Sequence, residues 1–284
     1  MEEQDNNNKQ SKEFYPPAKL SKLSLAYGKL LVFGFLTLGF LGFFLILKFL
    51  RKDHSLSNLQ VNVRKIWSKI GLKFCGLDIE IIGKESIKAD VFVANHISWL
   101  DILTLQSHLN VVFIAKSEVK TWAIFGLLAR SANTVFVDRR MMAAKAQESQ
   151  LITCLKKKNR MCFFPEGTST DGFSVLPFKS TLFEAFTKFS KEDGSDCWVQ
   201  PITIFYKASN NDFSRLYGWW GDMNLIASII NVVAFSRASK VTLTFHEPIN
   251  ASEIRDRKLL SDKSEEAIRK GHLVQLERVN SLDI

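Results

Sequence analysis

The chain has 284 residues, 46% of them hydrophobic, so it can bury the core of one large domain, with or without small appendages. Its formal net charge of +9 favours an anionic partner, either nucleic acid or the surface of an anionic membrane. The absence of zinc-finger spacing, an RNP-like run or a basic-region heptad argues against nucleic acid and favours the membrane.

The first 22 residues form a polar arm with three successive asparagines and two successive prolines. We predict that this arm, 1–22, is disordered, because such a composition cannot bury a core. The next segment differs sharply: the 18 residues 30–47 carry no charge, with Lys29 before them and Lys48 after them. As a helix they span roughly 27 Å at about 1.5 Å per residue, close to the thickness of a hydrocarbon core.

We therefore predict that 23–77 holds a membrane anchor followed by an amphipathic helix, with a buried core helix or a signal peptide as the alternatives for the apolar segment. Basic residues after that segment, including Lys48, Arg51 and Lys52, place the following domain on the cytoplasmic side of the inner membrane. The amphipathic helix covers 59–74, where apolar residues recur every three or four positions, at Leu59, Val63, Ile66, Ile70 and Phe74. It lies either in the membrane interface or against the domain core.

Short β-rich runs then alternate with helical patterns, which predicts an α/β domain over 78–250 with a mixed sheet of seven strands flanked by helices. The predicted strands are 78–82, 91–95, 111–115, 134–137, 161–164, 199–206 and 241–245. The predicted helices are 99–107, 119–131, 141–157, 182–190 and part of 223–236. The charged remainder, 251–284, is expected to be a peripheral tail.

The four cysteines lie far apart and form no C-x-x-C pair. We expect free, mostly buried thiols in a reducing compartment, with no disulfide framework and no zinc site.

The first polar strand end is 95–101, where His96 follows an apolar run and Asp101 comes five residues later. A histidine titrates near neutral pH and can take a proton, and an aspartate bonded to its other ring nitrogen orients it. Residues five apart do not share a helix face. The pair can therefore meet only if His96 precedes a helix and Asp101 lies in its first turns, with Ser98 as a candidate N-cap. The spacing alone is a weak signal.

Three further strand ends carry polar residues. Arg139 follows the strand at 134–137 and is placed to bind a phosphate, although a surface salt bridge is the favoured explanation when this motif is taken alone. The loop at 163–170 reads Phe-Phe-Pro-Glu-Gly-Thr-Ser-Thr, in which a strand-ending turn explains the proline and the glycine but not the Glu-Gly-Thr order. Pro201 lies within the pattern of a strand, which indicates an edge or a bulge.

Taken together, N-H-x-S-x-x-D, V-F-V-D-R, F-P-E-G-T and V-x-P-I resemble the glycerolipid acyltransferase family, in its lysophosphatidate (1-acyl-sn-glycerol-3-phosphate) acyltransferase branch. The resemblance covers about residues 60–250. The segment Lys116-Ser117-Glu118 also resembles that family. Ser169 is a departure, because the family often has arginine after its Glu-Gly-Thr block, and this leaves the acceptor open.

The resemblance implies transfer of a fatty acyl group from a thioester to the hydroxyl of a lysophospholipid. His96 would deprotonate that hydroxyl and Asp101 would orient the ring, while Arg139 and Lys116 would hold the acceptor phosphate. The residues implied to line the glycerol-phosphate site are Glu166, Gly167 and Thr168. No metal or cofactor is expected. The implied partners are membrane lipids, the lysophospholipid, and acyl-CoA or acyl carrier protein as donor.

Lysophosphatidate is the expected acceptor, and another lysolipid such as lyso-ornithine lipid is the alternative. The stretch 217–235 is expected to be an interfacial helix, a wall of the acyl-chain site or an ordinary buried helix. Two other classes remain: a serine hydrolase using Ser98 or Ser169, which lacks a G-x-S-x-G motif, and a non-catalytic membrane scaffold.

Overall fold

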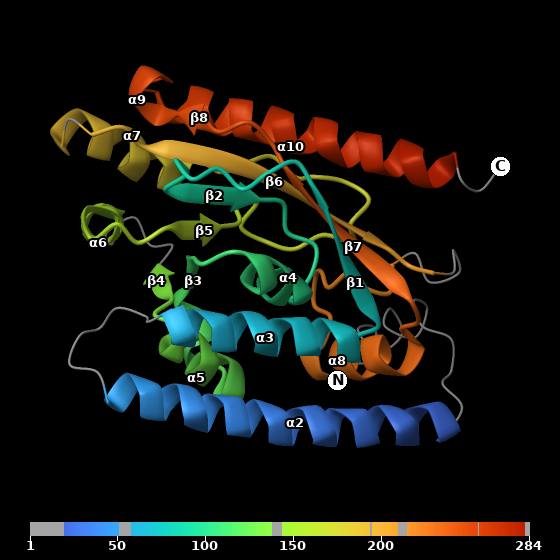
Figure 1. Ribbon diagram of the computed structural model, residues 1–284. Coiled ribbons are helices and arrows are strands. Elements are labelled where there is room, and N and C mark those ends of the chain that lie inside the picture. The colour runs from blue at the N-terminus through green and yellow to red at the C-terminus, as the bar shows by residue number, and fades with distance from the viewer. Residues whose placement is uncertain are drawn as a thin grey trace, which may run out of the picture.

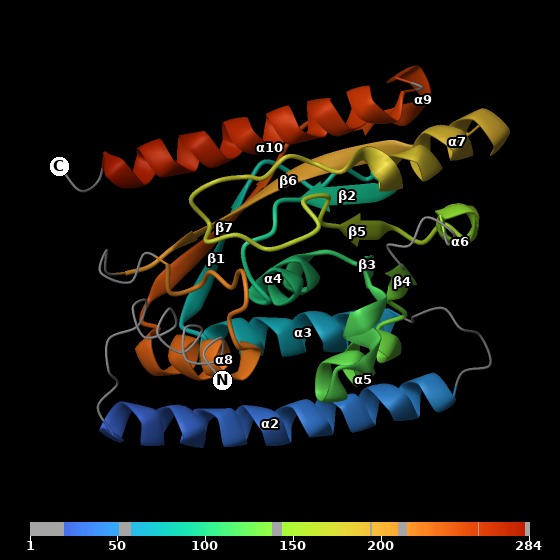
Figure 2. The ribbon, with the colours of Figure 1, turned by 180° about the vertical axis from the view of Figure 1, so that it is seen from behind.

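The computed structural model describes residues 20–50, 58–137, 144–193, 195–209, 215–254 and 256–281. Over these ranges the chain forms one twisted sheet with helices on both faces (Figures 1 and 2). The predicted α/β class with a mixed sheet is confirmed. Two predictions lie wholly or mostly outside the described residues, namely the disordered arm at 1–22 and the position of Arg139.

The sheet runs in the order β1-β7-β6-β2-β5-β3-β4, with a short strand β8 paired to β6. The described pairings are parallel except those that β6 makes with β7 and β8. The strands are β1 Leu77–Ile82, β2 Val91–Ala94, β3 Val112–Lys116, β4 Val135–Val137, β5 Met161–Phe163, β6 Trp198–Lys207, β7 Ser239–Phe245 and β8 Ile249–Asn250. β1 to β7 match the seven predicted strands, and β8 was not predicted.

The described helices are α2 Leu20–Phe49, α3 Asn58–Phe74, α4 Leu100–His108, α5 Ala123–Ser131, α6 Ala144–Lys156, α7 Phe183–Asp193, α8 Leu225–Phe235, α9 Ala251–Ile254 and α10 Arg257–Asn280. Two short 3-10 helices are η1 Ser117–Thr121 and η3 Ser180–Leu182. The helix predicted over 119–131 is wrong in one respect, because extended backbone at Trp122 divides it into η1 and α5. The Trp122 ring packs edge-on against Trp219, which fixes it between the two helices.

Two hydrophobic cores lie on opposite faces of the sheet, and β2 contributes to both. Phe92 and Ala94 enter the core formed with α3, α4 and α8, whereas Val91 and Val93 enter the core formed with α6, α7 and α10. All four side chains are fully buried. Burial on both faces explains the continuous apolar run of this strand, since alternate residues point to opposite sides.

Helix α2 lies along the outside of α3 and α8 and forms an outer layer (Figure 1). The Phe33 ring stacks on Trp67 of α3 at 6.0 Å, and the Trp67 indole N–H donates to the Thr37 hydroxyl at 3.0 Å. Among the described helices, α2 alone is long and apolar enough to cross a membrane, judged by length and composition. Its outward face exposes large apolar side chains, including Leu31, Phe35 and Phe49.

Helix α3 is packed between α2 and α4, so the core-packing alternative for this segment holds. The predicted apolar face is wrong in part, because Leu59 and Ile66 are about half exposed. The buried face instead includes polar residues that bond to α4 and the residues after it: Ser68 accepts from Gln106 at 3.0 Å, and Arg64 donates to Asn110 at 3.2 Å. A prediction from hydrophobic periodicity considers only apolar residues. It therefore misses a buried helix face that packs through hydrogen bonds between polar side chains.

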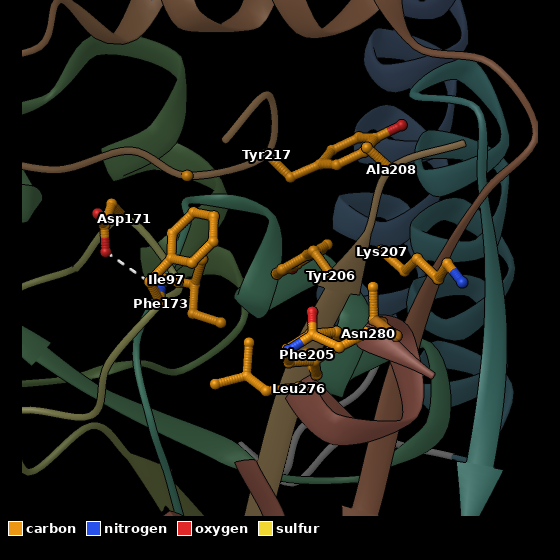
Figure 3. A pocket seen from close by; sticks show the side chains of 13 residues that line it. Ile97, Asp171, Phe173, Phe205, Tyr206, Lys207, Ala208, Tyr217, Leu276 and Asn280 are labelled. Carbon is orange, nitrogen blue, oxygen red and sulfur yellow. Dashed lines mark hydrogen bonds between the residues drawn. The ribbon is translucent and has the colours of Figure 1, made fainter. Parts of the chain in front are cut away.

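The segment after 250 is not a loose appendage. Helix α10 packs along β6 and α7 and buries Leu260 and Ile268 in the second core (Figure 2). The stretch over 217–235 contributes α8, which packs against α2 and buries Val232 and Val233. A cavity of about 240 Å³ lies between the end of β6, the loop at 171–173 and the last turns of α10 (Figure 3).

Candidate active site

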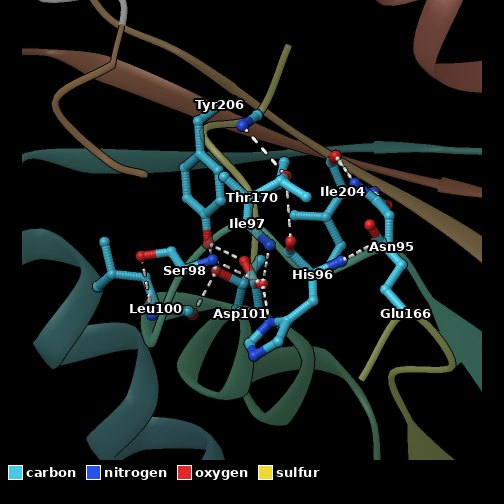
Figure 4. A network of polar contacts seen from close by, with 12 residues as sticks. Asn95, His96, Ile97, Ser98, Leu100, Asp101, Glu166, Thr170, Ile204 and Tyr206 are labelled. Carbon is cyan, nitrogen blue, oxygen red and sulfur yellow. Dashed lines mark hydrogen bonds and ion pairs between the residues drawn. The ribbon is translucent and has the colours of Figure 1, made fainter. Parts of the chain in front are cut away.

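The polar residues singled out in the sequence gather where parallel strands β2 and β5 end, beside β6 (Figure 4). Ligands of open α/β sheets bind at the carboxyl ends of the strands, because loops there can present side chains freely. Asn95 makes the turn out of β2: its side chain accepts from the Ile204 N–H at 2.7 Å and donates to the Ile204 carbonyl at 2.9 Å. This pair of bonds fixes the next residue, His96, against β6.

His96 and Asp101 meet as the sequence required. His96 precedes α4, Asp101 is the second residue of that helix, and His96 Nδ1 lies 2.7 Å from Asp101 Oδ2. The same Oδ2 accepts the backbone N–H groups of Ile97 at 2.7 Å and Ser98 at 2.9 Å. Asp101 therefore folds back over the turn before the helix, which brings residues five apart into contact. The structural N-cap is Trp99, one residue after the predicted Ser98.

The hydrogen bonds to Asp101 determine which nitrogen of His96 is free. A carboxylate only accepts, so the proton lies on Nδ1 and the lone pair lies on Nε2. The other oxygen, Oδ1, accepts the Tyr206 hydroxyl at 2.8 Å, and the Asp101 side chain is completely buried. The His96 side chain keeps 18% exposure, and its ring stacks on Phe164 at 4.2 Å. The arrangement is a buried carboxylate holding an accessible base.

Glu166 supports His96 through the backbone. Oε1 accepts the His96 N–H at 2.6 Å and Oε2 accepts the Leu176 N–H at 2.8 Å, while the residue is 2% exposed. Burial raises the pKa of Glu166 to about 7, against the opposing effect of the two N–H donors, with Asp101 adding to the rise. Its carboxylate faces backbone amides within the fold, so it is poorly placed to contact a substrate directly.

The raised pKa of Glu166 predicts a pH dependence of stability that Glu166→Gln removes. Between about pH 4.5 and pH 7 the folded state keeps the proton while the unfolded state loses it. The contribution is thus fully present below about pH 4.5 and is lost as pH rises through about 7, by on the order of 3 kcal/mol. Denaturant titrations from pH 4.5 to 8 measure the wild-type minus Glu166→Gln difference in unfolding free energy. A difference that stays constant contradicts the assignment.

The other residues expected at the site lie on neighbouring strand ends. Lys116 is the last residue of β3 and pairs in register with Val137, the last residue of β4. Arg139 follows Val137 by two residues, outside the described ranges. Gly167 has φ +72°, a conformation that favours glycine, and Thr168 is exposed. The backbone of the loop is thus turned so that Thr168 faces outward.

Sequence reasoning missed Tyr206 and gave no role to Thr170. Thr170 donates its backbone N–H at 2.9 Å and its hydroxyl at 3.2 Å to the His96 carbonyl. Tyr206 ends the long apolar run of β6, and a buried tyrosine hydroxyl needs a partner. That signal pointed to a polar contact but did not identify Asp101.

Two other kinds of chemistry find little support at this site. Ser98 is completely buried, and its hydroxyl accepts the Leu100 N–H at 3.3 Å, so it is not placed as a nucleophile. Within the described part of the chain, no group of three His, Cys, Asp or Glu side chains could hold a metal ion.

Comparison with known proteins gives a consistent result. A family model described as Acyltransferase matches residues 78–205. The lyso-ornithine lipid O-acyltransferase of Rhodobacter capsulatus is 38% identical over 203 residues, which cover 72% of this chain and 73% of that protein. The enzyme of the same description from Brucella abortus is 35% identical, over 71% of this chain and 78% of the relative.

Other relatives carry a different description. The 1-acyl-sn-glycerol-3-phosphate acyltransferase of Neisseria gonorrhoeae is 27% identical over 68% of this chain and 73% of that protein. The crystal structure of the 1-acyl-sn-glycerophosphate acyltransferase PlsC from Thermotoga maritima superposes with a TM-score of 0.58 at 24% identity, over 90% of this chain and 96% of that one. That likeness concerns the fold.

Proposed function

This chain belongs to the acyltransferase family and acts on a lysolipid, and we propose that its acceptor is a lyso-ornithine lipid. The observation that carries a catalytic role for the site is the 2.7 Å contact between His96 and a buried Asp101, which leaves Nε2 of an accessible ring free. The acceptor rests on two relatives described as lyso-ornithine lipid O-acyltransferases, at 38% and 35% identity over 72% and 71% of this chain, against 27% over 68% of this chain for the Neisseria gonorrhoeae enzyme. This replaces lysophosphatidate, the acceptor expected from the sequence.

The proposed reaction needs one base and an activated donor. His96 Nε2 takes the proton of the lysolipid hydroxyl as its oxygen attacks the thioester carbonyl carbon. The carbon–sulfur bond breaks, and the thiolate that leaves receives the proton from His96. Asp101 stabilises the imidazolium formed between these steps. The thioester is already activated, so positioning and proton transfer suffice.

We propose that Lys116 and Arg139 bind the anionic part of the acceptor, which is a carboxylate in an ornithine headgroup and a phosphate in lysophosphatidate. Lys116 ends β3 and pairs in register with Val137, the last residue of the neighbouring strand β4, and Arg139 comes two residues later in the sequence. Ser169 supports the ornithine acceptor, since the family's frequent arginine, a strong phosphate ligand, is missing there. Glu166 positions His96, while Gly167 and Thr168 remain candidates to line the site.

We propose that the protein works at the cytoplasmic face of the inner membrane, through the exposed apolar face of α2. Leu31, Phe35 and Phe49 of that face are more than 60% exposed, which is unfavourable in water and favourable in lipid. Acceptor and product both reside in the bilayer, so anchoring supplies the substrate locally.

A competition assay tests the acceptor. Purified full-length protein receives equimolar lyso-ornithine lipid and lysophosphatidate with acyl-CoA or acyl carrier protein thioester, and mass spectrometry quantifies both products. We expect at least about ten-fold preference for lyso-ornithine lipid, equivalent to roughly 1.4 kcal/mol of differential transition-state binding. Preference for lysophosphatidate overturns the acceptor, and transfer to neither lipid with either donor overturns the proposed activity.

A further inference from the structure

Helix α10 lies beyond the residues that the family model matches and contacts the loop at 164–179 that follows β5. It is fixed to the sheet, because the Thr203 hydroxyl of β6 donates to the Ile268 carbonyl at 3.0 Å. A Cβ at Gly271 would lie 2.5 Å from that hydroxyl oxygen, so the helix approaches β6 closely there. The loop therefore meets a firmly held support.

His272 of α10 begins one line of hydrogen bonds to the site. Its Nε2 lies 2.8 Å from the Gly172 carbonyl oxygen, which only accepts, so Nε2 carries the proton. Burial lowers the pKa of His272, which favours the neutral ring. The Gly172 N–H donates to the Thr170 hydroxyl at 3.2 Å, and that hydroxyl donates to the His96 carbonyl at 3.2 Å. This line ends on the carbonyl side of His96.

Glu265 of α10 begins a second line. Its Oε2 accepts the Phe178 N–H at 2.6 Å. Two residues before Phe178, the Leu176 N–H donates to Glu166 Oε2 at 2.8 Å, and Glu166 Oε1 accepts the His96 N–H at 2.6 Å. This line ends on the amide side of His96, so α10 is linked to the backbone on both sides of that residue.

A cavity interrupts the packing between the loop and α10 beside Gly172, where the hydrogen bonds from His272 begin. Phe173 of the loop and Leu276 and Val279 of α10 line the cavity of about 240 Å³, which also borders Ile97 (Figure 3). The hydrogen bond from His272 therefore carries the link between Gly172 and α10. Gly172 also abuts Ile97, since a Cβ at this glycine would lie 3.1 Å from the Ile97 side chain. A shift of Gly172 is thus transmitted to the residue next to His96.

We propose that α10 positions the catalytic base, with His272 and Glu265 as positioning residues that act through the 164–179 loop on the backbone of His96. The inference rests on the proposed function, because it takes His96 as the base. A proton-accepting nitrogen must lie within hydrogen-bond reach of the hydroxyl, and a misplacement of about 1 Å costs roughly 100-fold in rate.

The test compares full-length His272→Leu with His272→Gln. Leucine removes the donor and keeps an apolar side chain, whereas the glutamine amide restores an N–H near the position of Nε2. We expect His272→Leu to lower kcat by about 10- to 100-fold, with the acceptor KM changed less than about three-fold. We expect His272→Gln to keep kcat within about three-fold of the wild type. Failure of glutamine to restore kcat overturns the proposal.

Leu273→Ala is the matched control at the next residue of the same helix, because its side chain is 58% exposed and lies outside the core that holds α10. Its melting temperature is expected to stay close to that of the wild type, with kcat within about two-fold. Hydrogen exchange of the 164–179 loop is expected to speed up in His272→Leu and not in Leu273→Ala. Equal kcat losses or unchanged loop exchange overturn the inference. The exchange readout is independent of activity, so an inactive wild type would overturn the proposed function separately.

Discussion

Replacing His96 with alanine is expected to lower kcat for acyl transfer by roughly 10²–10⁴-fold, the range that a general base supplies. The fold should persist, because Asp101 keeps three of its four donors, those from Ile97, Ser98 and Tyr206. Stopped-time assays with labelled acyl donor measure kcat, and circular dichroism with a thermal melt measures folding. Loss of the ring also removes the stacking on Phe164, so a small drop in melting temperature is expected.

His108→Ala is the matched control, since His108 ends the same helix α4 and is about a third exposed, near Glu85 rather than Asp101. Its kcat is expected to stay within about two-fold of the wild type. If His96→Ala keeps activity like that of His108→Ala, His96 is not the base and the site must be assigned elsewhere.

Asp101→Asn is expected to lower kcat by roughly 10³–10⁴-fold, by analogy with the loss that follows when a triad aspartate becomes an amide. An amide NH₂ at the position of Oδ2 faces His96, Ile97 and Ser98 together, so it reverses the tautomer, leaves Nε2 protonated and leaves two backbone donors unpaired. An NH₂ at the position of Oδ1 faces the Tyr206 hydroxyl instead. The first arrangement costs about 1–3 kcal/mol of stability, because these groups are buried. Both kcat and the unfolding free energy are therefore measured.

Tyr206→Phe distinguishes two roles of the hydrogen bonds at Asp101. One is to orient the His96 ring, and the other is to hold the Asp101 carboxylate in place. The substitution removes the donor to Oδ1, together with the 3.2 Å contact between the Tyr206 and Thr104 hydroxyls, and leaves the contact of Oδ2 with His96 intact. A loss of at most about ten-fold in kcat is expected, since one hydrogen bond to a charged group contributes about 1.5–3 kcal/mol, of which only part is felt in the transition state. An Asp101→Asn loss no larger than that of Tyr206→Phe contradicts the orienting role.

The strands and the pairing of His96 with Asp101 could be read from the sequence for definite reasons. Strands such as β2 are buried on both faces, so they appear as short apolar runs whose ends are marked by polar residues such as Asn95. Residues five apart can meet only if the first precedes a helix and the second lies in its first turns. The structure shows this geometry for His96 and Asp101.

The rest depended on contacts between distant segments. Glu166 was expected to face the substrate, but its carboxylate turns to the amides of His96 and Leu176, which local sequence does not reveal. Tyr206 reaches Asp101 from a strand more than a hundred positions later. Helix α10 has charged residues on much of its surface, so its pattern indicated a tail, whereas a narrow apolar stripe and His272 attach it to the domain.

Formation of the acylated lipid is the most direct readout of acyl transfer through His96. Purified full-length protein in lipid vesicles is given lyso-ornithine lipid and a labelled acyl thioester, beside His96→Ala prepared in the same way. We expect mass spectrometry to detect the diacylated ornithine lipid with equimolar free thiol in the wild type, and product formation at no more than a few per cent of that rate in the variant. Equal product from both proteins, or hydrolysis to free fatty acid without lipid product, would contradict it.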